Sequence, residues 1–181
     1  MNGSVSRRYA RALFPLAKQA GALESTAAEL GRAAAIAAHP SVRQVLRNPL
    51  ISADRRRDIV RLIVAEQPTS ELVDRFLMLL ADQQRLGDLP GIERHFSTML
   101  DTELGRVRVT VRSAAALAPE QQDQIVATFS RLTGKQVLPT LEIDPELLGG
   151  VVVEAQGRVY DGTVKTQFTR LAKQLADAAL L

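Results

Sequence analysis

The stretch GRVRVTVRS, residues 105–113, decides the fold class, because the spacing of the apolar residues changes here. Its three valines alternate with arginine and threonine, and a period of two is typical of a strand with one buried face. Before this stretch the apolar residues recur every three or four positions, which predicts helices. The sequence therefore predicts two domains: a helical domain over residues 1–105 and a small α/β domain over residues 106–181.

The first domain is expected to contain six short helices packed as an antiparallel bundle. In the first helix the apolar residues predict one stripe, formed by Val5, Tyr9, Ala12, Leu13, Leu16 and Ala20. Glycine, proline and capping residues separate the helices. These separators are Gly21, His39–Pro40, Asn48–Pro49, Ser52, and Thr69 or Ser70. The last of the six helices is predicted to start near Leu89.

The second domain is predicted to hold a short mixed sheet and two helices, which makes the whole chain α+β. A helix begins at Pro119 and ends at Gly134. Residues 137–143, VLPTLEI, form another strand, which Pro139 confines to an edge or a bulge. VVVEA and RVYD flank Gln156–Gly157, which suits a hairpin turn. Four apolar residues share one face of a last helix: Val164, Phe168, Leu171 and Leu175.

The charge composition argues against a nucleic-acid-binding protein. The 23 basic and 20 acidic residues are interspersed, the net charge is +3, and the chain has no tryptophan. Nucleic-acid binders concentrate charge on one face and supply aromatic side chains for stacking. A basic nucleic-acid-binding module that uses the arginines of the helical bundle and the strand RVRVTVR stays open as an alternative, and it predicts strongly salt-dependent binding.

No sequence motif indicates catalysis, a cofactor or a metal. TGKQV, residues 133–137, lacks the hydroxyl residue and the earlier glycine of a phosphate loop. His39 and His95 fall in different helices, and the chain has no cysteine. We expect no cofactor and no enzymatic activity. An enzyme with a site between Asp144 and Asp161 is a further alternative, and it requires a cleft with perturbed acids.

Arg55, Arg56 and Arg57 form the strongest basic run, at the start of the fourth helix. Successive helical residues are about 100° apart, so the three cannot form one stripe. We expect a solvated helix face, and contact with an acidic partner is the alternative.

Five segments, in their order along the chain, resemble one protein family. They are RRYARALFPLA (7–17), NPLIS (48–52), RLGDLPGIERHF (85–96), VRSAAALAPEQ (111–121) and IDPELLGGVVVEAQGRVYDGTV (143–164). Together they resemble the delta subunit of F-type ATP synthases, called the oligomycin-sensitivity-conferring protein in mitochondria. The resemblance covers essentially the whole chain. One departure is Gln156–Gly157, where many members have the turn glycine one residue earlier.

The resemblance implies a non-catalytic stator subunit. The helical domain would bind the N-terminal helices of the alpha subunits of the catalytic head, with or without its beta subunits. The second domain would bind the b-type subunits of the peripheral stalk, so that the head does not turn with the rotor during proton-driven ATP synthesis. The implied location is the cytoplasmic face of a bacterial inner membrane, with membrane association only through the complex and no nucleic-acid partner.

An alpha-subunit interface is predicted at Tyr9, Ala12, Leu13, Phe76 and Leu79. The first three lie in the YARAL part of the first helix, which matches the family. The last two lie on the fifth helix, which is apolar over more than half of its circumference. Surplus apolar surface suits a groove for a partner helix. A central place in the bundle accounts for the same pattern, so both interpretations stay open here.

The segment from Asp144 to Gly162 is predicted to be a structural joint of the stalk-binding domain. Asp144 caps a short turn in which Pro145 takes the first position. Gly149 suits a positive φ, and Gly150 allows a close backbone approach as the next strand begins. Asp161 or Thr163 starts the final helix, and Gly162 lies between them. No lysine or hydroxyl group is placed to turn these glycines into a phosphate site.

Overall fold

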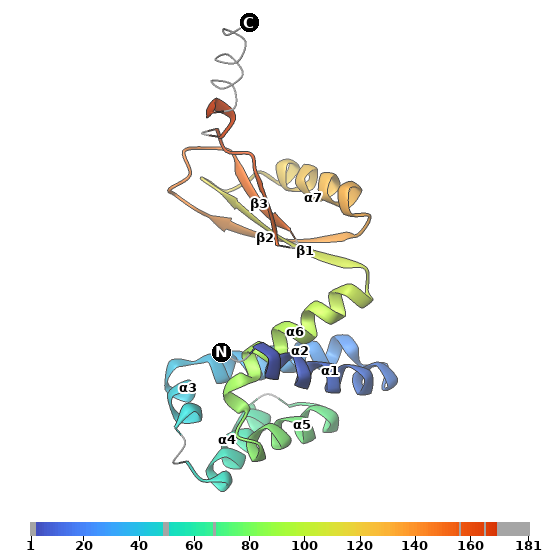
Figure 1. The fold of residues 1–181 in the computed structure, drawn as a ribbon, viewed down its shortest axis with the longest axis vertical. Coiled ribbons are helices and arrows are strands. Elements are labelled where there is room, and N and C mark those ends of the chain that lie inside the picture. The colour runs from blue at the N-terminus through green and yellow to red at the C-terminus, as the bar shows by residue number, and fades with distance from the viewer. Residues whose placement is uncertain (1–2, 49–50, 67, 156, 165, 170–181) are drawn as a thin grey trace, which may run out of the picture. The chain divides into compact units, whose positions relative to one another are not determined.

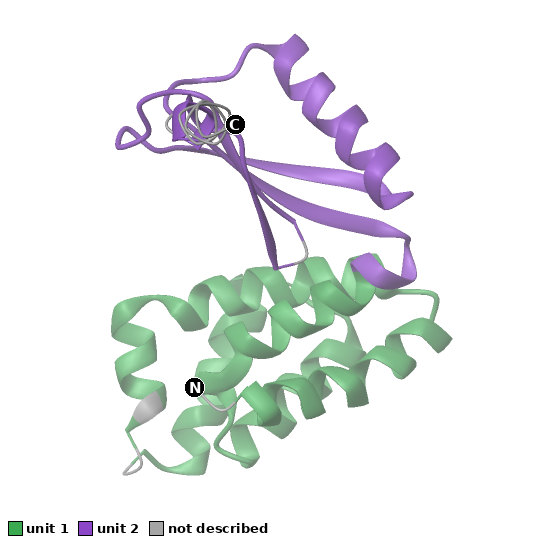
Figure 2. Cartoon of the chain, turned by 45° about the horizontal axis from the view of Figure 1, so that its top comes forward, with its two compact units in different colours: residues 1–100 green, residues 101–181 purple. Residues whose placement is uncertain are grey.

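The computed structural model describes residues 3–48, 51–66, 68–155, 157–164 and 166–169. These residues are mostly helical and include a small mixed four-stranded sheet, so the fold is α+β (Figure 1). The chain forms two compact units, residues 1–100 and residues 101–181, coloured separately in Figure 2. The predicted boundary lay at residue 105, whereas the units divide within the last turns of a helix that continues to Glu103.

The described part of the first unit consists of helices joined by short connections. Their bounds are α1 Gly3–Gln19, α2 Leu23–Ala38, α3 Pro40–Arg47, α4 Ala53–Glu66, α5 Glu71–Asp82, the 3₁₀ helix η1 Leu86–Asp88, and α6 Leu89–Glu103. Gly21 has a φ of +63°, and the Ser52 hydroxyl accepts a 3.4 Å hydrogen bond from the backbone N–H of Arg55. The sequence did not predict η1, because three residues are too short to show a period.

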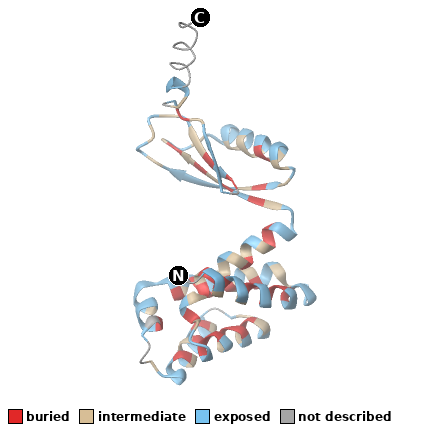
Figure 3. Ribbon diagram, viewed as in Figure 1, coloured by how far each residue is buried: buried red, intermediate tan, exposed pale blue. Residues whose placement is uncertain are grey.

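The core of the first unit is built mostly from leucine and alanine side chains, together with phenylalanine, valine and isoleucine. Figure 3 marks the buried residues of these helices in red. The rings of Phe14 on α1 and Phe96 on α6 pack with their centroids 5.3 Å apart. Ala33, Ala34 and Ala37 give α2 a buried face of small side chains, which lets neighbouring helices approach closely.

Helix α1 has two apolar faces, whereas the spacing of its apolar residues predicted one stripe. The buried residues are Ser6, Ala10, Leu13, Phe14 and Ala17. The predicted stripe shares only Leu13 with this set, and Leu16, which belongs to that stripe, is 51% exposed. Because Leu13 belongs to both sets, the two faces are adjacent on the helix. One face therefore packs into the core, and the other remains available at the surface.

The expectation that all three arginines of the basic run are solvated is wrong for Arg56. Its side chain is buried, and Nη2 donates a 3.3 Å hydrogen bond to the carbonyl oxygen of Asn48. Arg57 instead links two helices, because its Nε donates to Oδ1 of Asp82 at 2.8 Å. This bond and the charge of Asp82 raise the pKa of the Arg57 guanidinium. Packing at the start of α4, which the linear charge pattern does not reveal, separates the roles of the three residues.

The second unit contains a sheet with the strand order β2-β1-β3-β4. Its elements are β1 Arg106–Ser113, α7 Pro119–Thr133, β2 Gln136–Ile143, β3 Val151–Ala155 and β4 Arg158–Asp161. β1 and β2 are parallel, and the other two pairs are antiparallel. The edge position predicted for Pro139 and the antiparallel hairpin of β3 and β4 are confirmed, whereas Gln156 of the predicted turn lies outside the described residues. Residues 164 and 166–169 are helical, whereas Leu171 and Leu175 lie outside the described residues.

The two faces of the sheet differ in what covers them. Val107, Val109 and Val111 are buried together with Phe129 of α7. On the opposite face, Thr110 of β1 pairs with Glu154 of β3, which pairs with Val159 of β4. Glu154 and Val159 of that row are exposed. Arg108, two residues before Thr110 on the same face of β1, is exposed as well. The second unit therefore keeps one face on its core and presents polar and apolar side chains on the other.

Candidate partner-binding groove

A groove with apolar walls runs between α1 and α5 in the first unit. Its volume is about 570 Å³. Nine residues line it: Arg8, Tyr9, Ala12, Leu13 and Leu16 from α1, and Leu72, Arg75, Phe76 and Leu79 from α5. On each helix these positions follow a spacing of three or four residues, which places them on one face. The apolar residues that α1 contributes to the lining form the second apolar face of that helix.

The lining residues divide into a floor and two walls. Leu13 and Phe76 form the floor, since they are 1% and 6% exposed and also belong to the hydrophobic core. Leu16 and Leu79 form opposite walls and are 51% and 47% exposed. When a partner covers apolar walls that are half exposed to water, the burial of their surface makes the free energy of binding more favourable. We call this surface the α1–α5 groove.

Aromatic rings connect the two sides of the α1–α5 groove. The Tyr9 and Phe76 rings meet edge to face, with their centroids 6.4 Å apart. The guanidinium carbon of Arg8 lies 5.7 Å from the centroid of the Tyr9 ring, within cation–π range. These contacts hold the groove lining in a defined arrangement before any partner arrives.

All five residues predicted for the alpha-subunit interface line this one groove. Sequence reasoning did not include Arg8, Leu16, Leu72 and Arg75 among them. Leu16 and Leu72 continue the helical spacing from Leu13 and Phe76, so periodicity could have found them. The two arginines border the apolar positions, and only the packing of α1 near α5 reveals that they line the groove.

The predicted joint in the second unit is a close backbone crossing. Gly150 has a φ of +82°, and a Cβ added there would lie 2.8 Å from the Cα of Thr163. Gly149 has a φ of +146°, and a Cβ there would lie 3.2 Å from a methyl group of Val164. The backbone N–H of Gly162 donates to the carbonyl oxygen of Val151 at 2.9 Å. Side chains would disrupt this crossing, which accounts for the pair of glycines.

Two aspartates anchor the ends of this joint. Oδ1 of Asp144 accepts a hydrogen bond from the backbone N–H of Glu146 at 3.1 Å, across a turn that contains Pro145. Oδ1 of Asp161 accepts one from the backbone N–H of Thr163 at 2.9 Å, and Oδ2 accepts one from the Thr166 hydroxyl at 2.8 Å. Both carboxylates therefore accept hydrogen bonds from nearby backbone N–H or hydroxyl groups and stabilise the local turn.

A family model described as the ATP synthase delta (OSCP) subunit matches residues 5–175. The chain belongs to this family. Among its relatives, the ATP synthase subunit delta of Anaeromyxobacter sp. (strain Fw109-5) is 40% identical over 174 residues, covering 96% of this chain and 97% of the relative. The ATP synthase subunit delta of Desulforamulus reducens (strain ATCC BAA-1160 / DSM 100696 / MI-1) is 33% identical over 176 residues, covering 97% of each.

The delta-family fold also occurs in a solved structure. A chain in the cryo-EM structure of the Toxoplasma gondii mitochondrial ATP synthase hexamer matches with a TM-score of 0.64 and 22% sequence identity. The match covers 94% of this chain and 97% of that chain. At this identity the likeness concerns the fold.

Two other hollows occur in the first unit of this delta-family chain. One lies among α2, α3 and α4, has a volume of about 290 Å³ and includes Val45, Leu62 and Glu66 in its lining. The other has a volume of about 340 Å³ and a more polar lining that includes Ser6, Arg94 and His95. Residues of the described ranges form no group of three or more His, Cys, Asp or Glu side chains suited to a metal. None of the helices within those ranges combines the length and hydropathy needed to span a bilayer.

Proposed function

We propose that this chain is the non-catalytic stator subunit of an F-type ATP synthase. The first unit holds the alpha subunits of the catalytic head, and the second holds the b-type peripheral stalk. The head is thereby kept from turning with the rotor while protons drive ATP synthesis. The proposal rests on membership of the ATP synthase delta (OSCP) family and on the α1–α5 groove, which supplies a surface suited to a partner helix.

The observation that carries the proposal is the apolar lining of the α1–α5 groove. An amphipathic helix binds by placing an apolar stripe in such a groove, with contacts at a spacing of three and four residues. Leu16 and Leu79 are each about half exposed, and completing the burial of such side chains contributes on the order of 1 kcal/mol each. The groove therefore offers the α subunit's N-terminal helix an apolar contact along both of its sides.

The strength required of a stator contact agrees with an apolar groove. A contact that lasts for minutes, formed at about 10⁶ M⁻¹s⁻¹, needs a dissociation constant around nanomolar or lower. That affinity corresponds to about −12 kcal/mol. Charged groups at a rim mainly change association rates and specificity. The apolar floor and walls supply the larger share of the binding free energy.

The second unit supports stalk binding through its outward sheet face. Arg108, Glu154 and Val159 are exposed there, and the backbone joint at Gly150 fixes the strand that carries Glu154. A face that mixes charged and apolar groups suits the charged helices of a peripheral stalk. The complex would lie on the cytoplasmic face of a bacterial inner membrane, with this chain attached through the other subunits.

A nucleic-acid-binding module is the less favoured alternative. Arg57 and Arg85 form ion pairs with Asp82 and Asp88 within the first unit, and all four side chains are less than half exposed. These pairs reduce the cationic surface available to phosphates, whose contacts dominate nucleic-acid binding.

A titration with the N-terminal peptide of the cognate alpha subunit tests the proposal. Ala12→Asp and Leu79→Asp each place a carboxylate in the α1–α5 groove, so both should abolish peptide binding measured by isothermal titration calorimetry. Both positions are exposed, so the fold should be retained in circular dichroism. Wild-type affinity in both variants would contradict this site for the alpha subunit.

Matched control variants come from other helices of the same unit. Ala35→Asp on α2 and Leu62→Asp on α4 make the same chemical changes at exposed positions outside the α1–α5 groove. Both should bind the peptide like the wild type. Loss of binding in these controls would show a general effect of added negative charge and would count against the groove as the cause.

A further inference from the structure

We infer that the α1–α5 groove selects a helix with carboxylates on both sides of its apolar stripe, and that Arg8 and Arg75 recognise them. This inference rests on the proposed function, since it specifies the partner chemistry at the same groove. The observation behind it is the lining itself: its charged members are Arg8 from α1 and Arg75 from α5, with seven apolar or aromatic side chains around them.

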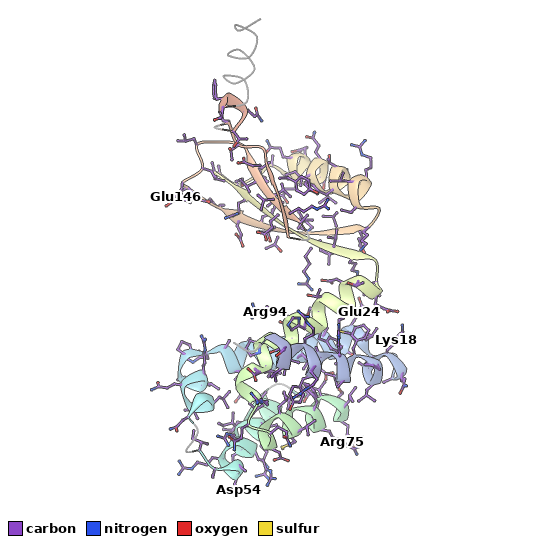
Figure 4. All side chains as sticks on the ribbon, viewed as in Figure 1. Lys18, Glu24, Asp54, Arg75, Arg94 and Glu146 are labelled. Atoms are coloured by element: carbon purple, nitrogen blue, oxygen red, sulfur yellow. The ribbon has the colours of Figure 1, made fainter. Side chains whose placement is uncertain are left out.

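The two arginines lie at the outer borders of the groove. On α1, Arg8 is one turn before Ala12 and borders Tyr9 on the solvent side, since successive residues are about 100° apart. On α5, Arg75 bears the same relation to Leu79, and Figure 4 shows its side chain projecting from that helix. A helix seated on the floor residues Leu13 and Phe76 would therefore have one guanidinium along each edge.

Both guanidinium groups are accessible to a partner. The guanidinium carbon of Arg8 lies 5.7 Å from the centroid of the Tyr9 ring, and the residue is exposed, so its N–H groups can donate to a carboxylate of a partner. Arg75 pairs with Glu71 one turn earlier on α5, and both side chains are 78% exposed. Exposed pairs of this kind are weak, so a carboxylate of the partner can replace Glu71.

The charge around the α1 side favours the same partner. Helix α1 carries Arg7, Arg8, Arg11 and Lys18 and has no acidic residue between Gly3 and Gln19. On α5, the acidic residues Glu71, Asp74 and Asp82 are not part of the groove lining. A partner helix with lysines beside its stripe would meet like charges along α1, which lowers its affinity, whereas Glu71 beside Arg75 reduces the repulsion at the α5 edge.

The size of the preference follows from the exposure of the two pairs. One exposed ion pair changes a dissociation constant by about twofold to fivefold. Two independent pairs on opposite edges should therefore favour an acidic-flanked helix over a neutral one by about fourfold to twenty-fivefold at low salt. The preference should fall toward unity in about 1 M salt, where screening shortens the range of charge interactions to about 3 Å.

Three peptides test the inference against the full-length chain. Each is the N-terminal peptide of the cognate alpha subunit, with the residues beside its apolar stripe set to Glu, Gln or Lys. The wild type should bind them in the order Glu, Gln, Lys, from tightest to weakest, by fluorescence anisotropy. The double variant Arg8→Glu, Arg75→Glu should reverse this order.

A matched double variant separates a local effect from one of net charge. Arg43→Glu, Arg55→Glu makes the same change in net charge at exposed positions on α3 and α4, outside the groove lining. It should keep the wild-type order. Equal affinities for the three peptides, or an order that the Arg8→Glu, Arg75→Glu variant does not change, would overturn the inference and leave the proposed function intact. Failure of all three peptides to bind the wild type would overturn both.

Discussion

The Tyr9 ring on α1 meets the Phe76 ring on α5 edge to face, with the ring planes inclined at 69°. Phe76 is 6% exposed and belongs to the core, whereas Tyr9 is only partly buried. The contact therefore joins the packed interior of the first unit to the surface of the α1–α5 groove. A groove whose floor is part of the core is formed before binding, so a partner helix loses less free energy in ordering it.

Substitutions of Leu13 and Leu16, which are one helical turn apart on α1, should have different effects on stability and on peptide binding. Leu13→Ala removes a 1% exposed side chain, so it should lower the free energy of unfolding by about 2–5 kcal/mol. Leu16→Ala removes a 51% exposed side chain, so it should lower the free energy of unfolding by about 1 kcal/mol or less. It should also weaken the affinity for the alpha peptide by about tenfold. Urea unfolding and peptide titration measure the two effects.

The wall residue on α5 provides a second comparison. Leu79→Ala should behave like Leu16→Ala, because Leu79 is 47% exposed and lies on the opposite wall. Leu62→Ala on α4, at a position 66% exposed, should affect neither stability nor peptide binding by a measurable amount. A Leu16→Ala variant as unstable as Leu13→Ala would contradict the division into floor and walls.

Helix α1 shows what a single sequence can and cannot predict about this fold. Helical spacing correctly predicts a helix, and it identifies the stripe containing Tyr9, Ala12, Leu13 and Leu16. A second apolar stripe, with Ala10, Phe14 and Ala17, is the one that enters the core. Periodicity treats the two stripes alike, since the choice between them depends on where the other helices pack. The groove thus follows from tertiary packing acting on a helix with two apolar faces.

Charged residues were less predictable than apolar ones. The run Arg55–Arg57 predicts a solvated helix face, yet Arg56 is buried and Arg57 binds Asp82 on α5. Arg8 and Arg75 also become groove residues only through the approach of α1 and α5. Long charged side chains reach partners distant in the sequence, so local patterns say little about their contacts.

Substitution of Gly150 tests the backbone joint in the second unit. In Gly150→Ala the new Cβ would collide with the carbonyl oxygen of Gly162 and approach the Cα of Thr163, at a φ of +82°. Backbone strain and overpacking together should destabilise the unit by about 2–5 kcal/mol. Faster amide hydrogen exchange in β3 and β4 of the full-length chain would measure this loss.

Gly157→Ala is the matched control for Gly150→Ala. Gly157 also has a positive φ, +76°, but nothing lies within 4 Å of a Cβ added there. It should therefore lose only about 1–2 kcal/mol through the unfavourable backbone angle. Equal destabilisation by the two substitutions would show that the crossing with Gly162 and Thr163 contributes nothing beyond the backbone angle.

Asp161 should stabilise the start of the last helix through both of its carboxylate oxygens. Asp161→Ala removes the acceptors for the Thr163 backbone N–H and the Thr166 hydroxyl, so it should cost about 1–2 kcal/mol. Asp161→Asn keeps one oxygen acceptor and should recover most of that loss. Hydrogen exchange at residues 163–169 measures the effect, and unchanged exchange in Asp161→Ala would contradict the capping role.

The outward sheet face leads to a prediction for the stalk. Val159→Asp places a carboxylate on this face at a position 60% exposed, in the row that contains Thr110 and Glu154. If the b-type stalk packs here, loss of an apolar contact and repulsion from Glu154 should weaken stalk binding by about tenfold, while the alpha peptide binds normally. Leu148→Asp, at a position 88% exposed outside the strands, should leave both partners bound. Pull-down of b-type subunits measures the effect, and full stalk binding by Val159→Asp would place the stalk on another surface of the second unit.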